Sequence, residues 1–216
     1  MRVLQDAMIR RGSGDYEAEF NNALRSSIKE GDTVWDVGAH VGIYTGQFLE
    51  WAGSSGRVVA FEPLPRAFGE LEKNFGAHKN ATLVPAALSS LPGRSNFCGD
   101  TDDSITMNAH LAEGGELTGE SIAVDVVTAD EMVAKGVAGP NAVKIDVEGF
   151  EEEVLIGGQK TFSDPSCRDI LIEVHFTRIH ERGIGASASR IVGMLKEWGY
   201  DVDWVDSSHL HARRRA

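Results

Sequence analysis

Apolar and polar residues alternate along this chain in blocks whose spacing predicts strands and helices in turn. Short apolar runs predict strands at residues 34–37, 58–61, 81–88, 122–128, 142–145 and 169–176. Apolar residues at helical spacing predict helices at residues 15–30, 43–52, 65–76, 129–137 and 186–199, and a further helix that opens at Gly149. Residues 200–205 and 209–213 have the pattern of a closing antiparallel hairpin. The order of these blocks indicates an α/β fold.

The first predicted strand ends in a glycine-containing turn, within the sequence VWDVGAHVGIYTG. Gly38 and Gly42 would let the backbone approach a ligand closely, and the helix that follows would begin there with free N–H groups. The turn is neither a phosphate loop nor a strict GxGxxG, because no Gly-Lys-Ser/Thr follows and the two glycines are four residues apart. It therefore indicates a ligand site or, as the alternative, close packing of a helix on the sheet.

The second predicted strand stops at Glu62 and Pro63, and Glu62 comes 24 residues after Gly38. Doubly wound nucleotide-binding folds place an acid on the ribose hydroxyls at a spacing of roughly 20 residues. A carboxylate can accept hydrogen bonds from two vicinal hydroxyls. We therefore predict that Glu62 holds a ribose, and a solvated strand end is the alternative.

Two later strands carry polar side chains at their ends. The segment AVKIDVEG contains Lys144, Asp146 and Glu148, which alternation places on one side if the strand continues that far. In DILIEVHF, Glu173 and His175 leave the next strand on a shared face. Open α/β sheets bind their ligands at the carboxyl ends of the strands, so these residues are candidates for a catalytic cluster.

Residues 89–121 are rich in Ser, Gly, Asp and Asn and keep no hydrophobic period. A structureless segment of this length is uncommon in a compact domain and is usually a functional loop. We expect a loop that covers the substrate, and a variable insertion is the alternative.

The length of 216 residues, with 42% hydrophobic and 25% charged residues, fits one globular domain over residues 1–216, with an N-terminal helical segment at residues 1–30. No apolar run approaches the roughly 18 residues of a membrane span, and the start lacks the apolar centre of a secretory signal. Cys98 and Cys167 show no metal-ligand spacing, which favours reduced thiols in a cytoplasmic protein.

The formal net charge of −12 argues against nucleic acid or an anionic membrane as a partner, because neither would be attracted. The basic run of residues 213–215 is expected to be a solvated tail. A small molecule is therefore the expected partner, and both a monomer and a homodimer remain open.

Several motifs resemble, in the same order, those of the FkbM-type methyltransferases, namely DVGAHVG, FEP, VPAALS, KIDVEGFEEEVLIGG and IEVH. The resemblance runs from Thr33 to His175, about two thirds of the chain. It implies a class I fold dependent on S-adenosylmethionine (SAM). That fold is Rossmann-like, with a mostly parallel seven-stranded sheet, helices on both faces and a C-terminal antiparallel hairpin. Members of the family are mostly O-methyltransferases that act on sugars, polyketides and other secondary metabolites.

The resemblance also implies the residues that hold the cofactor, which are Asp36, Gly38, Ala39, His40, Gly42, Thr45, Glu62, Pro63, Ala86, Ala87 and Asp146. Glu62 would hold the ribose hydroxyls, and Pro63 would border the adenine. Asp146 would face the sulfonium and the methyl acceptor. His40 stands where the family usually has an asparagine.

Methyl transfer from a sulfonium is an in-line displacement, so alignment of the reacting atoms supplies much of the acceleration. A hydroxyl acceptor must also lose its proton, and the candidate bases are His175, Asp146, Glu148 and Glu173. His175 ranks first, because a neutral imidazole near its ordinary pKa suits a base at neutral pH. The same carboxylates and histidine could instead coordinate a hard or borderline divalent metal ion, although no dedicated metal motif is present.

The function predicted from the sequence is SAM-dependent O-methylation of a hydroxyl on a small molecule. One alternative is a non-catalytic Rossmann-like protein that binds a nucleoside or another small molecule. The other is an NAD-dependent oxidoreductase, which the absence of a strict GxGxxG and of a lysine–tyrosine pair disfavours.

Overall fold

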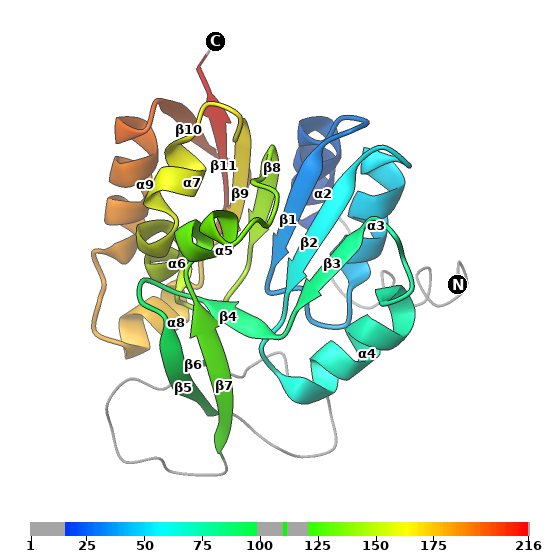
Figure 1. Ribbon diagram of the computed structural model, residues 1–216. Coiled ribbons are helices and arrows are strands. Elements are labelled where there is room, and N and C mark those ends of the chain that lie inside the picture. The colour runs from blue at the N-terminus through cyan, green and yellow to red at the C-terminus, as the bar shows by residue number, and fades with distance from the viewer. Residues whose placement is uncertain (1–15, 99–109, 112–120, 216) are drawn as a thin grey trace.

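The computed structural model describes residues 16–98, 110–111 and 121–215, and Figure 1 shows the arrangement of their helices and strands. The main sheet has seven strands in the order β10-β11-β9-β8-β1-β2-β3. They are β1 (Thr33–Val37), β2 (Arg57–Phe61), β3 (Ala81–Val84), β8 (Ala142–Ile145), β9 (Asp169–Glu173), β10 (Tyr200–Trp204) and β11 (His209–Arg214). Strand β11 runs antiparallel to β9 and to β10, and the other described neighbours are parallel. The predicted Rossmann-like sheet and its hairpin are confirmed.

Helices cover both faces of this sheet, as predicted (Figure 1). One face carries α2 (Tyr16–Ser27), α3 (Ile43–Ala52) and α4 (Pro65–Phe75). The other carries α5 (Ala129–Ala134), α6 (Glu151–Gly157), α7 (Gln159–Ser163) and α9 (Ser187–Glu197). The alternation of side chains along β1 explains this layering, since Val34 packs under α2 and α3 while Trp35 packs in the opposite core. No helix in the described part of the chain is long and apolar enough to cross a membrane.

The chain departs from the sequence-based prediction after β3. The strand predicted over residues 81–88 is two strands, because Pro85 has no N–H to donate and separates β3 from β4 (Ala86–Leu88). Strand β4 leaves the main sheet and pairs with β7 (Ser121–Val127) in a second sheet of order β4-β7-β5-β6.

The segment predicted to be structureless supplies two strands of this second sheet, β5 (Gly93–Cys98) and β6 (His110–Leu111). The prediction of a structureless loop is therefore wrong for these residues. Strand β5 is polar along most of its length, so it lacked the apolar run that marks a strand. The remainder of the expected covering loop, at residues 99–109 and 112–120, lies outside the described residues, as do residues 1–15 of the predicted N-terminal segment.

The strand predicted at residues 169–176 is also longer than the observed β9 (Asp169–Glu173). The strand stops at Glu173, and His175 precedes a short helix, α8 (Phe176–Glu181), that the sequence analysis did not predict. Cys167 is a buried free thiol, as predicted.

The expectation of a solvated tail at residues 213–215 is wrong for Arg214. Its guanidinium donates hydrogen bonds to the carbonyl oxygens of Trp198, Cys167, Phe162 and Asp164 at 2.7 to 3.0 Å, and to the hydroxyl of Tyr200 at 2.8 Å. Arg213 lies one position away on the exposed face of β11 and pairs with Asp203. Arg214 thus ties the last strand to the loops around α7 and α9.

We predict that Arg214→Met lowers the free energy of unfolding by roughly 2 to 4 kcal/mol, because several carbonyl oxygens lose their donor. Arg213→Met is the matched control and should change the free energy by less than roughly 0.5 kcal/mol, since its ion pair is exposed. Urea denaturation followed by circular dichroism measures both. Equal losses for the two variants would contradict the structural role of Arg214.

Candidate functional site

The turn after β1 brings the backbone against the neighbouring strand. Gly38 has φ 78°, and a Cβ there would lie 1.8 Å from the carbonyl oxygen of Asp146, so only glycine fits. The N–H groups of Gly38 and Ala39 both donate to the carbonyl of Phe61 at 3.0 Å, and that of Gly42 donates to the carbonyl of Ala39. These three N–H groups are therefore not available to a ligand, and Gly38 allows the close approach of the turn to the carbonyl of Asp146.

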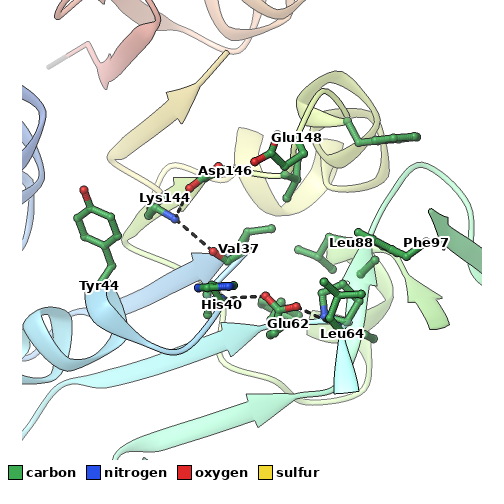
Figure 2. Close-up of a pocket in the computed structure, with 18 of the residues that line it drawn as sticks. Val37, His40, Tyr44, Glu62, Leu64, Leu88, Phe97, Lys144, Asp146 and Glu148 are labelled. Carbon is green, nitrogen blue, oxygen red and sulfur yellow. Dashed lines mark hydrogen bonds and ion pairs between the residues drawn. The ribbon is translucent and has the colours of Figure 1, made fainter. Parts of the chain in front are cut away.

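Glu62 is held rigidly at the end of β2. Its Oε2 accepts the backbone N–H of His40 at 2.8 Å, and its Oε1 accepts that of Leu64 at 2.9 Å (Figure 2). Burial raises the pKa of Glu62 to about 7, although the two N–H groups act in the opposite direction. Each oxygen of a carboxylate has two acceptor positions, so one on each remains for a pair of vicinal hydroxyls.

A buried cation lies beneath the turn. The ammonium of Lys144 is 3.1 Å from Asp146 Oδ2, 3.3 Å from the carbonyl oxygen of Gly38 and 3.6 Å from Asp36 Oδ1. The ring of Tyr44 covers it at 4.9 Å. Burial lowers the pKa of Lys144, but Asp146 and then Asp36 raise it above its ordinary value, so the lysine remains charged. Lys144 therefore pairs with two carboxylates, those of Asp146 and Asp36.

The predicted catalytic residues come together at the carboxyl ends of β8 and β9. His175 Nε2 lies 3.6 Å from Asp146 Oδ1, 3.6 Å from Glu148 Oε2 and 3.9 Å from Glu173 Oε1. The other ring nitrogen, Nδ1, is 2.8 Å from Oε1 of Glu151, a fully buried carboxylate that is not among the predicted site residues.

The protonation of His175 differs from the expectation of a neutral imidazole near its ordinary pKa. Burial lowers the pKa of His175, but the hydrogen bond to Glu151 and the charges of Glu151, Asp146 and Glu148 raise it to about 9. At neutral pH this ring is a cation and cannot act as the first-ranked base. Burial also raises the pKa of Glu148 above its ordinary value.

A pocket connects the turn to this cluster (Figure 2). The residues of the sequence prediction that line it are Gly38, Ala39, His40, Glu62, Pro63, Ala86, Ala87, Asp146 and Glu148. Lining residues that the prediction did not include are mostly apolar, and they include Ile43, Tyr44, Leu64, Leu88, Phe97, Val147 and Phe150. These side chains come from many elements, and no local pattern in the sequence marks them.

Five predicted site residues are not among the lining residues. Asp36 is fully buried and accepts a hydrogen bond from Thr45 at 2.6 Å, so both support the turn from below. Gly42 packs against α4, where a Cβ would lie 2.5 Å from the ring of Phe75. His175 and Glu173 stand next to Asp146 and Glu148, outside the lining.

Comparison with known proteins gives a consistent result. Residues 36–202 match the model of the methyltransferase FkbM domain. The chain is 31% identical over 160 residues to the hexuronic acid methyltransferase AglP of Haloferax volcanii, covering 74% of this chain and 62% of that protein. It is 29% identical over 204 residues to the 31-O-demethyl-FK506 methyltransferase FkbM of Streptomyces tacrolimicus, covering 81% and 75%. The chain thus spans less than two thirds of the length of AglP.

Solved structures share the fold at low sequence identity. A methyltransferase FkbM from Methylobacillus flagellatus KT superposes with a TM-score of 0.55 at 14% identity, covering 96% of this chain and 57% of that one. Fibrillarin of Aeropyrum pernix, crystallised with natively bound SAM, gives a TM-score of 0.54 at 14% identity, covering 89% and 73%.

We predict that Lys144→Met destabilises the protein by roughly 3 to 5 kcal/mol, because it leaves the carboxylates of Asp36 and Asp146 next to each other without their buried counter-ion. Adding Asp36→Asn to this variant should recover part of the loss. Lys135→Met, which removes an exposed lysine paired with Glu131, is the control and should change the stability little. Thermal and urea denaturation test this, and a loss for Lys144→Met no larger than the control would refute it.

Proposed function

Since this chain belongs to the methyltransferase FkbM family, we propose that it transfers a methyl group from SAM to a hydroxyl oxygen of a small molecule, such as a sugar, polyketide or other secondary metabolite. The observation that carries the proposal is the pocket itself. It joins Glu62 and the glycine turn at one end to Asp146 and Glu148 at the other.

The residues at the end of the pocket that holds Glu62 and the glycine turn fit SAM. Glu62 keeps one acceptor position on each oxygen for the two ribose hydroxyls, while His40 and Leu64 hold it in place. Pro63, Ala86 and the other apolar lining residues offer a surface for a flat base. SAM supplies a methyl group on a positively charged sulfur, and Asp146 at the end of β8 provides the opposite charge.

The end of the pocket at Asp146 and Glu148 favours a neutral hydroxyl acceptor. Asp146, Glu148 and Glu173 converge there within reach of His175, and a carboxylate at this place can take up the proton of a hydroxyl. The proton of the hydroxyl must pass to a neighbouring group during attack. Glu148 is our first candidate for this role, because it lines the pocket while His175 does not and because Lys144 engages Asp146.

The net charge of −12 supports a small-molecule acceptor over nucleic acid. The name of AglP points to a sugar, and that of the Streptomyces tacrolimicus relative points to a hydroxyl of FK506. Non-catalytic nucleoside binding and NAD-dependent oxidation remain the alternatives, which binding and turnover measurements separate.

We predict that calorimetric titration detects binding of S-adenosylhomocysteine but not of NADH. The affinity for S-adenosylhomocysteine should fall about 10-fold between pH 8 and pH 6. The ionised carboxylate of Glu62 accepts both hydroxyls, and with a pKa of about 7 this form is lost as the pH falls. Glu62→Gln should bind at least about 10-fold more weakly at pH 8.

The same variant is the control for the pH effect, because glutamine does not titrate and its affinity should stay constant over this range. A wild-type affinity that is independent of pH would contradict the ionised Glu62 contact, and preference for NADH would reject the cofactor assignment.

The activity test is incubation with SAM and a panel of hydroxylated acceptors, including a hexuronic acid glycoside and a macrocyclic alcohol, with mass spectrometry of the products. We expect a methyl ether, which survives mild alkali, whereas a methyl ester would not. Glu148→Gln should lower the rate by roughly 100-fold or more and leave the affinity for S-adenosylhomocysteine nearly unchanged. Product from an acceptor without a hydroxyl, or an unchanged rate in the variant, would contradict this assignment.

A further inference from the structure

Three side chains with metal-binding atoms meet where β8 and β9 end. A carboxylate oxygen of Asp146, a carboxylate oxygen of Glu148 and a ring nitrogen of His175 all lie within 4.8 Å of one another. The two carboxylates reach the same nitrogen, Nε2, at 3.6 Å each. Two of these residues line the pocket at the end that we assign to the acceptor.

We propose that Asp146, Glu148 and His175 bind a divalent metal ion that accepts both carboxylate oxygen and imidazole nitrogen, such as Mn²⁺ or Zn²⁺. Oxygen-only ions such as Ca²⁺ are disfavoured by the imidazole ligand. This inference deepens the proposed function and rests on it for the identity of the acceptor end.

The spacing fits such an ion. Oxygen and nitrogen ligands lie about 2.0 to 2.2 Å from Zn²⁺ or a similar ion. Neighbouring ligands of a tetrahedral or octahedral ion are then about 3 to 3.5 Å apart, by the same bond lengths. The observed 3.6 Å separations need only small rotations of the side chains to reach this range.

A buried carboxylate orients the histidine. Glu151 is fully buried, and its Oε1 lies 2.8 Å from His175 Nδ1 and also accepts the N–H of Gly149 at 2.8 Å. A hydrogen bond from Nδ1–H to a carboxylate leaves Nε2 as the nitrogen that faces Asp146 and Glu148, and histidine ligands of metals are commonly held in this way. Binding of the ion at Nε2 would replace the proton on that nitrogen.

The other oxygen of Glu151 points to the same conclusion. Its Oε2 is buried and has no hydrogen-bond partner among the described residues. An acid buried without a full set of partners costs free energy, so a structural role alone explains Glu151 poorly. Orientation of a metal ligand accounts for its position.

The neighbouring cations leave ligand atoms available. Lys144 binds Oδ2 of Asp146, whereas Oδ1 is the oxygen that faces His175. Arg178 Nε forms an ion pair at 3.8 Å with Glu148 Oε2, the same oxygen that faces His175, so a bound ion would share this oxygen with Arg178. A metal ion at this place would stabilise the negative charge that builds on the acceptor oxygen as its proton leaves.

The test is Mn²⁺ binding to the full chain after treatment with a chelator and desalting, followed by electron paramagnetic resonance of free Mn²⁺ and by calorimetry. We expect one strong site per chain in the wild type. Glu148→Gln and His175→Ala should each weaken it about 10-fold or more, and Glu151→Gln should weaken it by about 10- to 100-fold through loss of orientation.

His180→Ala is the matched control, because it removes an exposed histidine of the short helix that follows His175 and should leave Mn²⁺ affinity unchanged. Thermal denaturation without metal identifies any variant that fails to fold, and bound Mn²⁺ should raise the wild-type melting temperature. Wild-type protein that binds no Mn²⁺, or a folded Glu148→Gln that binds it as tightly, would overturn the metal site.

The two proposals fail separately. Methyl transfer that persists in chelator, together with no Mn²⁺ binding, would remove the metal site and leave the methyltransferase function intact. Specific Mn²⁺ binding without S-adenosylhomocysteine binding or methyl transfer would remove the methyltransferase function and leave the metal site intact.

Discussion

The buried ammonium of Lys144 is the interaction on which the geometry of the site depends. It joins Asp36 on β1, the carbonyl of Gly38 in the turn and Asp146 after β8. Separation of any of these groups would leave a charge or a carbonyl unpaired in the interior, at a cost of several kcal/mol. One cation therefore keeps the cofactor end and the acceptor end of the pocket at a fixed distance.

The position of the pocket follows from the strand order. Strands β1 and β8 are neighbours, and the chain continues from β1 to β2 on one side and from β8 to β9 on the other, so the two connections part and open a crevice at the carboxyl ends of the strands. The second sheet closes one side of this crevice, because Pro85 diverts the chain out of the main sheet, and β4 and β5 then bring Ala87 and Phe97 to the pocket. Phe97 thus comes from the segment that the sequence analysis expected to be a loop, whereas Ala87 lies in the predicted strand at residues 81–88.

Local patterns in the sequence predicted the main sheet, since most of its strands are short apolar runs followed by a turn or a helix signal, as at Val34 to Val37. Residues at strand ends, such as Glu62 and Asp146, could be assigned to the candidate site because the ends of the strands were predicted. What depends on distant contacts could not be predicted. The charge on His175 comes from Glu151 on another element, the hydrogen bonds of Arg214 come from carbonyls elsewhere in the chain, and polar β5 becomes a strand only by pairing with β7.

Two residues other than glycine adopt positive φ in the described chain, His40 at 51° and Glu148 at 53°, and both line the pocket. Asparagine and histidine tolerate this region better than most residues, so His40 meets the same backbone requirement as the asparagine usual in the family. Glutamate has no such advantage, and its conformation costs roughly 1 to 3 kcal/mol. Gly149 follows with φ 95°, and together the two residues turn the chain sharply before α6. The turn places Glu148 next to one nitrogen of His175 and Glu151 next to the other, so one short segment holds the imidazole from both sides.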